Sequence, residues 1–220
     1  MSLILKLLFA SVIAFSLFFA SWYVLHGDLI FDADIGRDFH LLRELDEKKI
    51  VLIGPRSSTG LFHGPLWTYV NYPSYLIGGG NPVTVGFGWV VFIALFGLVS
   101  FYVADKLFGR ATAYLYSMMA TLYAAFHAKG MFNPHGAMFL IPLCFFFFVM
   151  YFKNPKAKYL LLHLATLSAI IQFQMADGMP LLALSVLAIM YKIFKTRKFK
   201  HVFVYLLLPV FLVNFIVFDL

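Results

Sequence analysis

The stretch LILKLLFASVIAFSLFFASWYVL occupies residues 3–25 and contains one charged side chain, Lys6. About 20 consecutive apolar residues in a helix are enough to cross the hydrocarbon core of a bilayer. The run is too long for the core of a signal peptide, and no small-x-small cleavage site follows it. We therefore expect an uncleaved first membrane span.

Six further apolar runs follow a long polar stretch, residues 26–82. Their approximate bounds are 83–104, 111–128, 136–152, 159–173, 179–194 and 202–218. This pattern predicts an all-α fold, a polytopic transmembrane bundle of about seven spans. We expect one transmembrane domain over residues 1–220, with an outer loop at 26–82 and six spans over 83–220.

The composition supports a membrane protein. Of the 220 residues, 62% are hydrophobic and 12% are charged, whereas an ordinary soluble domain has about 25% charged residues. A water-soluble core could not hide this much apolar surface, so most of it must face lipid or other helices. The chain has one cysteine, Cys144, which cannot form an internal disulfide.

The basic residues predict the orientation, because cytoplasmic connections of membrane proteins are rich in Lys and Arg. Every second connection is basic, through Lys6, Lys106, Arg110, Lys153, Lys156, Lys158, Lys192, Lys195, Arg197, Lys198 and Lys200. We expect a multi-pass protein of the plasma (inner) membrane with a cytoplasmic N-terminus. The net charge of +7 then reflects topology, and we expect no nucleic-acid partner.

Residues 26–82, 129–135 and 172–178 would then face outward. The first of these connections holds seven of the ten acidic residues: Asp28, Asp32, Asp34, Asp38, Glu44, Asp46 and Glu47. A solvated linker is the simplest explanation for such a loop. However, apolar residues recur near helical spacing at Ile35, Phe39, Leu42 and Leu45, and the aromatics Trp67, Tyr69, Tyr72 and Tyr75 suit an interfacial helix.

Asp34, Arg37 and Asp38 have the spacing i, i+3, i+4 and would share one face of a helix. A carboxylate held beside a guanidinium stays ionised near neutral pH. It can then accept a proton from a hydroxyl or hold a divalent cation. Asp32 is a second candidate, and an ordinary surface salt bridge is the competing explanation.

A second group of candidates is cationic: Arg56, His63 and Lys129. Lys129 is the only basic residue on the outer side outside the long loop, and a phosphate group near the membrane surface would explain it. A lysine that snorkels to the interface is the alternative. In the third outer connection, Gln174 either belongs to an ordinary helix–helix turn or contacts a ligand.

Other site types find no support in the sequence. The chain has no GxGxxG, Walker, CxxC or HExxH motif. Its histidines at 127, 163 and 201 stand alone, so we assign no metal ligand to them. Whether a divalent cation takes part in the chemistry stays open.

These motifs together resemble the GT-C superfamily of polytopic glycosyltransferases, in the branch related to protein mannosyltransferases and aminoarabinose transferases. An acidic motif after the first span is typical of that superfamily, and residues 34–38 occupy this place. Bacterial relatives often continue with a Gly-Pro, Ser/Thr-rich turn and a His-x-Pro-Leu-aromatic motif, matched at 54–60 and 63–67. Phe132-Asn133-Pro134 resembles their aromatic-Asn-Pro motif, which a basic residue such as Lys129 often precedes.

The chain departs from the family pattern at three places. Relatives often carry Arg in place of Lys129, Trp in place of Phe132, and a His-Tyr pair where this chain has Gln174-Met175. Most members are also about twice as long or longer. We therefore expect either the front part of a longer enzyme, truncated at its C-terminus, or a shortened relative.

The resemblance implies a glycosyltransferase that moves a sugar, with inversion, from a polyprenyl-phosphate donor to a glycan, lipid or protein acceptor outside the cytoplasm. It implies catalytic roles for Asp34, Asp38 and Asp32. It implies substrate-binding roles for Arg37, Arg56, His63, Lys129, Asn133, His135 and Gln174. Two alternatives remain: a non-catalytic translocase or scaffold for lipid carriers, and an inactive fragment. No charged residue lies well inside a span, which disfavours transport.

Overall fold

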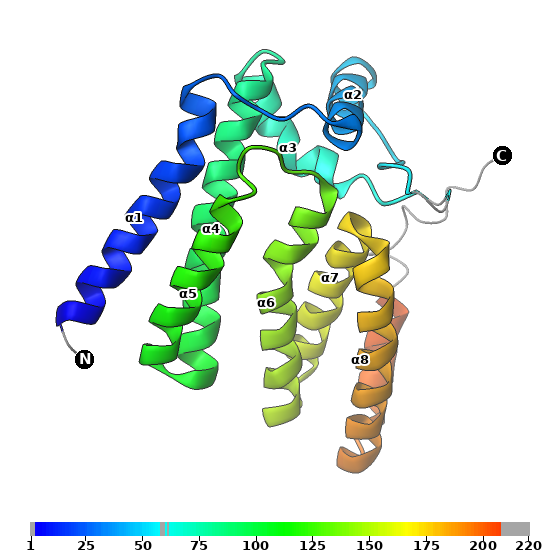
Figure 1. The fold of residues 1–220 in the computed structure, drawn as a ribbon. Helices are drawn as coiled ribbons and strands as arrows, with labels where there is room; N and C mark the ends of the chain where they lie inside the picture. Colours follow the sequence, from blue (N-terminus) through cyan, green and yellow to red (C-terminus); the bar gives the residue numbers. More distant parts are fainter. Residues whose placement is uncertain (1–2, 58–59, 61, 208–220) are drawn as a thin grey trace. The chain divides into compact units, whose positions relative to one another are not determined.

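The structure is a computed structural model that describes residues 3–57, 60 and 62–207 (Figure 1). Its helices are α1 (Leu3–Leu25), α2 (Ala33–Lys48), α3 (Leu66–Ile77), α4 (Pro82–Phe108), α5 (Arg110–Ala125), α6 (Asn133–Lys153), α7 (Ala157–Phe173), α8 (Met175–Thr196) and the 3₁₀ helix η1 (Phe199–Leu207). The only extended pairing among the described residues is an isolated antiparallel bridge between Arg56 and Phe62. The prediction of an all-α fold is confirmed for this part of the chain.

Four of these helices, α1, α4, α6 and α8, are long and apolar enough to cross a membrane. Helix α7 is apolar but shorter, with 17 residues, and α5 has 16. The chain is therefore a multi-pass membrane protein, as predicted, whereas the count of seven spans is not confirmed. Most of the seventh predicted span, residues 202–218, lies outside the described residues, and its described part belongs to η1.

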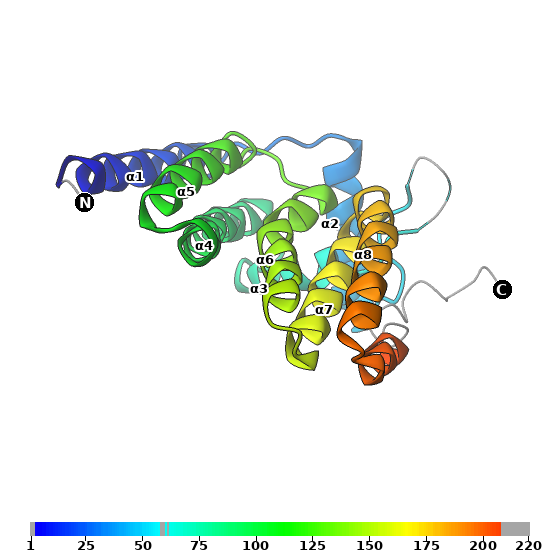
Figure 2. The ribbon, with the colours of Figure 1, turned by 90° about the horizontal axis from the view of Figure 1, so that it is seen from below.

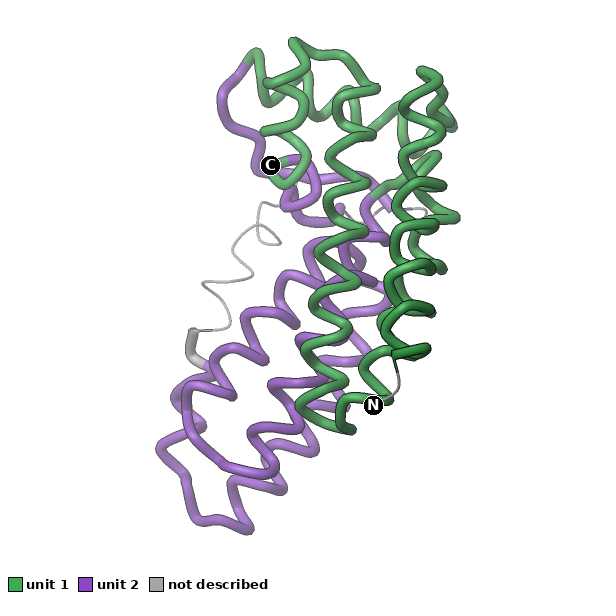
Figure 3. The backbone as a smooth tube through the Cα atoms, turned by 90° about the vertical axis from the view of Figure 1, so that its left-hand side faces the viewer, with its two compact units in different colours: residues 1–47, 69–132 green, residues 48–68, 133–220 purple. Residues whose placement is uncertain are grey.

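The chain forms two compact units. Residues 1–47 and 69–132 form the first, in which α1, α4 and α5 lie side by side (Figure 2). Residues 48–68 and 133–220 form the second, which contains α6, α7, α8 and η1 (Figure 3). Each unit is described by itself below.

Small residues bring α4 and α5 close together in the first unit. A Cβ added to Gly97 would lie 2.3 Å from Thr121 Oγ1, so a larger residue here would force the Thr121 side chain to move. Ser117 Oγ also donates a hydrogen bond of 2.7 Å to the Gly97 carbonyl. Small residues and hydroxyl hydrogen bonds are the usual means by which membrane helices approach each other closely.

Helices α2 and α3 attach to this unit through both apolar and polar contacts. The predicted apolar stripe of α2 is buried at Ile35, Leu42 and Leu45, which removes it from water. The Tyr72 hydroxyl on α3 donates to Asp46 Oδ1 at 3.0 Å.

The first turns of α3 are also tied to α4, by a buried pair. Trp89 Nε1 on α4 donates to Asn71 Oδ1 at 2.9 Å, and both side chains are almost fully buried. A buried indole N–H needs such a partner. The aromatic segment predicted as an interfacial helix is therefore helical and anchored by polar bonds.

The second unit has an antiparallel pair, α6 and α7, against which α8 and η1 pack. Its core contains the buried side chains of Tyr151, Leu160, Leu164, Ile189 and Ile193. These residues come from α6, α7 and α8, so the three helices share one apolar core.

Helices α7 and α8 are joined by one residue, Gln174, because α7 ends at Phe173 and α8 begins at Met175. The expectation of a longer connection over 172–178 is therefore wrong. Gly178 permits the tight junction, since a Cβ there would lie 2.7 Å from the Ile171 Cα. The polar residues that suggested a loop belong instead to helix ends.

Candidate functional site

The acidic face of α2 forms as the sequence spacing predicts. Arg37 Nη1 lies 2.7 Å from Asp34 Oδ1, and Arg37 Nη2 lies 3.2 Å from Asp38 Oδ1. One guanidinium therefore bridges two carboxylates, which its planar fork of donors allows. The Asp34 side chain is 49% exposed and that of Asp38 only 9%, so Asp34 is the carboxylate that a solute can reach.

Asp32 has a structural role at the start of the same helix. Its Oδ1 accepts a hydrogen bond of 2.9 Å from the Ile35 backbone N–H, and its carbonyl accepts one from Gly36 N at 2.9 Å. An aspartate in this position caps the N-terminus of a helix by satisfying an otherwise unpaired N–H. The capping bond explains Asp32 without catalysis, although a catalytic role for it stays a prediction.

Lys129 lies against the connection that joins α1 to α2. Lys129 Nζ is 2.8 Å from Asp28 Oδ2, and its carbonyl accepts a hydrogen bond of 2.9 Å from Ile30 N. The hydrogen bond to Asp28 raises the pKa of Lys129 above its ordinary value of 10.5. The ammonium also lies 5.3 Å from the centre of the Tyr23 ring.

The next residue, Gly130, allows the turn after α5 to approach α2 closely. A Cβ at Gly130 would lie 2.8 Å from Ile35 Cδ1, on the first turn of α2, and 3.1 Å from Ile30 Cβ. The turn after α5 therefore touches both the connection and α2 itself. The turn that follows α5 and the acidic helix α2 lie at the same end of α1, α4 and α5 (Figure 1), and Lys129 belongs to this turn.

This end of the first unit carries an excess of negative charge. Residues 28–47 contain seven acidic residues and two arginines, and Lys129 adds one further cation, so acidic residues outnumber basic ones. Such a surface attracts cations and proton-bearing groups. Among the residues that the structure describes, however, no group of three or more His, Cys, Asp or Glu side chains is placed to hold a metal ion.

The remaining predicted residues belong to the second unit. His63 is 7% exposed, and its Nδ1 accepts a hydrogen bond of 3.3 Å from Met175 N, at the first residue of α8. Its backbone closes the turn that begins at Gly54, since His63 N donates to the Pro55 carbonyl at 2.8 Å and the His63 carbonyl accepts from Gly54 N at 3.0 Å. His63 therefore fixes the turn to the start of α8.

Arg56 lies in the same turn and is exposed, with its guanidinium 5.9 Å from the centre of the Phe62 ring. It is the most accessible cation among the predicted substrate-binding residues of this unit, since His63 is buried. His135, in the first turn of α6, is half-buried.

Asn133 and Gln174 lie near the junction of α7 and α8. Asn133 is 3% exposed and its Nδ2 donates a hydrogen bond of 2.7 Å to the Phe173 carbonyl, at the last residue of α7. The carbonyls of a last helical turn lack partners within the helix, so Asn133 supplies one. The Gln174 backbone N–H donates to the Ile170 carbonyl at 2.8 Å.

The predicted residues thus fall into two groups. The structure gathers the acidic residues with Arg37 and Lys129 in the first unit, and it ties His63 and Asn133 to the α7–α8 junction in the second. The sequence reasoning missed one partner, Asp28, which pairs with Lys129. Asp28 follows the first span and Lys129 follows α5, and no local sequence pattern connects the two residues.

No protein-family model, curated protein or solved structure matches this chain. The class of protein is defined by the fold and the apolar helices. The described chain is an all-helical, multi-pass membrane protein, and an acidic helix bridged by an arginine follows its first span.

Proposed function

We propose that this chain is a membrane glycosyltransferase that transfers a sugar from a polyprenyl-phosphate donor to an acceptor outside the cytoplasm of a plasma (inner) membrane. The observation that carries the proposal is the acidic face of α2, where Arg37 bridges Asp34 and Asp38. The contact of Lys129 with the connection before α2 adds a cation at the same end of the unit. The proposal also rests on the resemblance of the motifs to the GT-C superfamily.

In the proposed reaction the acceptor hydroxyl attacks the anomeric carbon of the donor sugar. Asp34 takes the hydroxyl proton as a general base, and Arg37 fixes the orientation of this carboxylate. The bond between the anomeric carbon and the phosphate oxygen breaks, so polyprenyl phosphate leaves and the configuration inverts. Holding acceptor and donor together supplies much of the rate gain.

Negative charge grows on the phosphate as it leaves, and cations positioned there stabilise the transition state. Lys129 has three N–H donors and uses one toward Asp28, so others remain for a phosphate oxygen. The acidic excess around Asp34 suits the acceptor side of the reaction instead.

The test measures sugar transfer by the purified chain in lipid nanodiscs, with a radiolabelled polyprenyl-phosphate sugar and release of polyprenyl phosphate as the readout. Loss of a general base typically slows a reaction about 10²–10⁴-fold, and we expect this for Asp34→Asn. The matched control is Glu47→Gln on the same helix, whose exposed carboxylate pairs with Arg43 at 2.8 Å. Undiminished transfer by Asp34→Asn would remove this residue from the mechanism.

A second candidate is a non-catalytic protein that binds lipid carriers. It is favoured by the internal hydrogen bonds of His63 and Asn133, which give these predicted substrate-binding residues structural roles. It predicts that the wild-type chain retains polyprenyl phosphate while no sugar is transferred. The same nanodisc assay, with bound lipid measured alongside, separates the two functions.

A further inference from the structure

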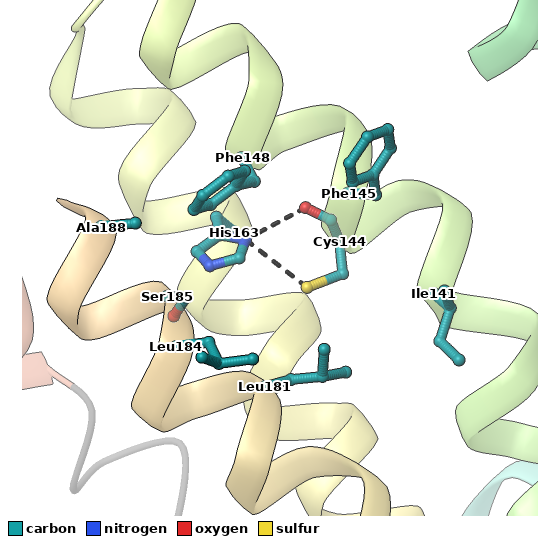
Figure 4. Close-up of a pocket in the computed structure, with 9 residues that line it drawn as sticks. All are labelled: Ile141, Cys144, Phe145, Phe148, His163, Leu181, Leu184, Ser185 and Ala188. Carbon is teal, nitrogen blue, oxygen red and sulfur yellow. Dashed lines mark hydrogen bonds between the residues drawn. The ribbon is translucent and has the colours of Figure 1, made fainter.

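The second unit contains a cavity of about 390 Å³ between α6, α7 and α8, a volume within the range of small-molecule sites. Apolar side chains such as Phe148 and Leu181 line it, together with Cys144, His163 and Ser185 (Figure 4). No charged side chain of the described residues lines it. Phe145 and Leu184, which also line it, are 49% and 66% exposed, so the cavity opens at the surface of helices that suit a lipid environment.

His163 is the polar feature of this cavity, and it is only 3% exposed. Its Nδ1 lies 3.0 Å from the Cys144 carbonyl oxygen and 3.5 Å from Cys144 Sγ. A carbonyl oxygen only accepts hydrogen bonds, so Nδ1 must carry the proton. In the neutral ring the other nitrogen, Nε2, is then an acceptor.

Nε2 is buried and has no hydrogen-bond partner among the described residues. This nitrogen is on the edge of the His163 ring that faces away from Cys144 and toward Ser185 (Figure 4). The Ser185 hydroxyl does not serve it, because Ser185 Oγ donates to the Leu182 carbonyl at 3.2 Å. A buried acceptor without a donor is costly, and a bound molecule with a hydroxyl group would remove that cost.

We propose that this cavity binds an uncharged lipid alcohol, whose apolar body fills the space between the three helices and whose hydroxyl donates to His163 Nε2. A charged headgroup does not suit the cavity, because the lining that the structure describes offers no counter-charge. A plain acyl chain fits the apolar walls but brings no donor for Nε2. The proposal does not depend on the proposed transferase activity.

The position of His163 along α7 agrees with this occupant. His163 follows the first residue of the helix, Ala157, by six positions, which is about 9 Å at 1.5 Å per residue. A hydroxyl bound there lies inside the apolar part of the helix, where water competes poorly for the hydrogen bond. The alcohol therefore gains the bond while its chain extends among the side chains of α6 and α8.

The test uses the full chain in phosphatidylcholine nanodiscs and a long-chain alcohol that carries a photoreactive diazirine. The comparison probe is its methyl ether, which has the same chain but no hydroxyl donor. We expect the alcohol to label peptides from α6 and α8 about three- to tenfold more than the ether does, the range for one hydrogen bond. The labelled peptides are located by mass spectrometry.

The variant His163→Phe removes the acceptor while keeping an aromatic ring, and we expect it to label equally with both probes. His127→Phe makes the same change outside the cavity and should keep the preference for the alcohol. Equal labelling of the wild-type chain by alcohol and ether would overturn the proposal, as would a preference that survives in His163→Phe. The wild-type comparison decides the matter even if His163→Phe does not fold.

Discussion

Asn133→Ala separates a structural role of this residue from the substrate-binding role that its motif suggests. In the structure Asn133 Nδ2 donates to the Phe173 carbonyl at 2.7 Å, and the two residues are 3% and 4% exposed. The alanine variant would remove the donor and leave the last carbonyl of α7 buried without it. Water cannot readily replace the amide at so buried a position.

The expected loss follows from the burial of the orphaned acceptor. Leaving a buried acceptor unsatisfied costs about 1–3 kcal/mol of the free energy of unfolding. Gly136 packs closely against the Phe173 ring, because a Cβ added to Gly136 would lie only 2.8 Å from a ring carbon. Little room exists for the helix end to shift and find another donor, so we expect a value of about 2 kcal/mol.

The free energy of unfolding is measured by denaturant titration in detergent micelles, where a shift of the midpoint without a change of slope reports stability. Asn154→Ala is the matched control, because Asn154 is exposed and surface substitutions change stability by about 0.5 kcal/mol or less. An Asn133→Ala variant as stable as the wild-type chain would refute the capping role. Reduced binding of the lipid donor without a stability change would then favour contact with substrate.

Other predictions concern helix packing and pH. Gly178→Ala should lower the free energy of unfolding by about 1–3 kcal/mol, since its Cβ would lie 2.7 Å from the Ile171 backbone. Gly36→Ala lies in the interior of α2, and its Cβ would have no other atom within 4 Å. This variant should instead raise the free energy of unfolding by up to about 1 kcal/mol. Equal effects in the same titration would contradict the packing at Gly178. Burial, and then the charge of Lys198, lower the pKa of His201 below 6.5. The unfolded chain therefore binds this proton more readily, so stability should be full above pH 6.5 and fall as pH drops through the folded-state pKa. His201→Gln should weaken this acid dependence in a titration from pH 7 to pH 4, and an unchanged dependence would exclude His201 as its source.

Hydropathy alone predicted the long helices well, because a membrane span needs a continuous apolar run and little else. The first span was predicted at residues 3–25, the bounds that α1 has. The α7–α8 junction was not predicted, because polar residues at a helix end look like a loop in the sequence. Its tightness depends on the contact of Gly178 with Ile171, which no local pattern reveals.

The candidate site was predictable where it depends on spacing within one helix. Asp34, Arg37 and Asp38 share a face because helical geometry requires it, and the structure pairs them. The Asp28–Lys129 pair was not predictable, because it joins residues from two turns that are distant in sequence. Asp32 could have been recognised as a cap, since an aspartate directly before an amphipathic run is a helix-start signal.

The proposed transferase requires that the Asp34 face of α2 lies outside the cytoplasm, and the single cysteine makes this directly measurable. In a Cys144→Ser background, Asp34→Cys is treated in intact cells with a membrane-impermeant maleimide. Asn154→Cys lies in the connection between α6 and α7, which the distribution of Lys and Arg predicts to be cytoplasmic, and serves as the reference. We predict labelling at position 34 in intact cells and at position 154 only after permeabilisation; labelling at 34 only after permeabilisation would contradict the proposal.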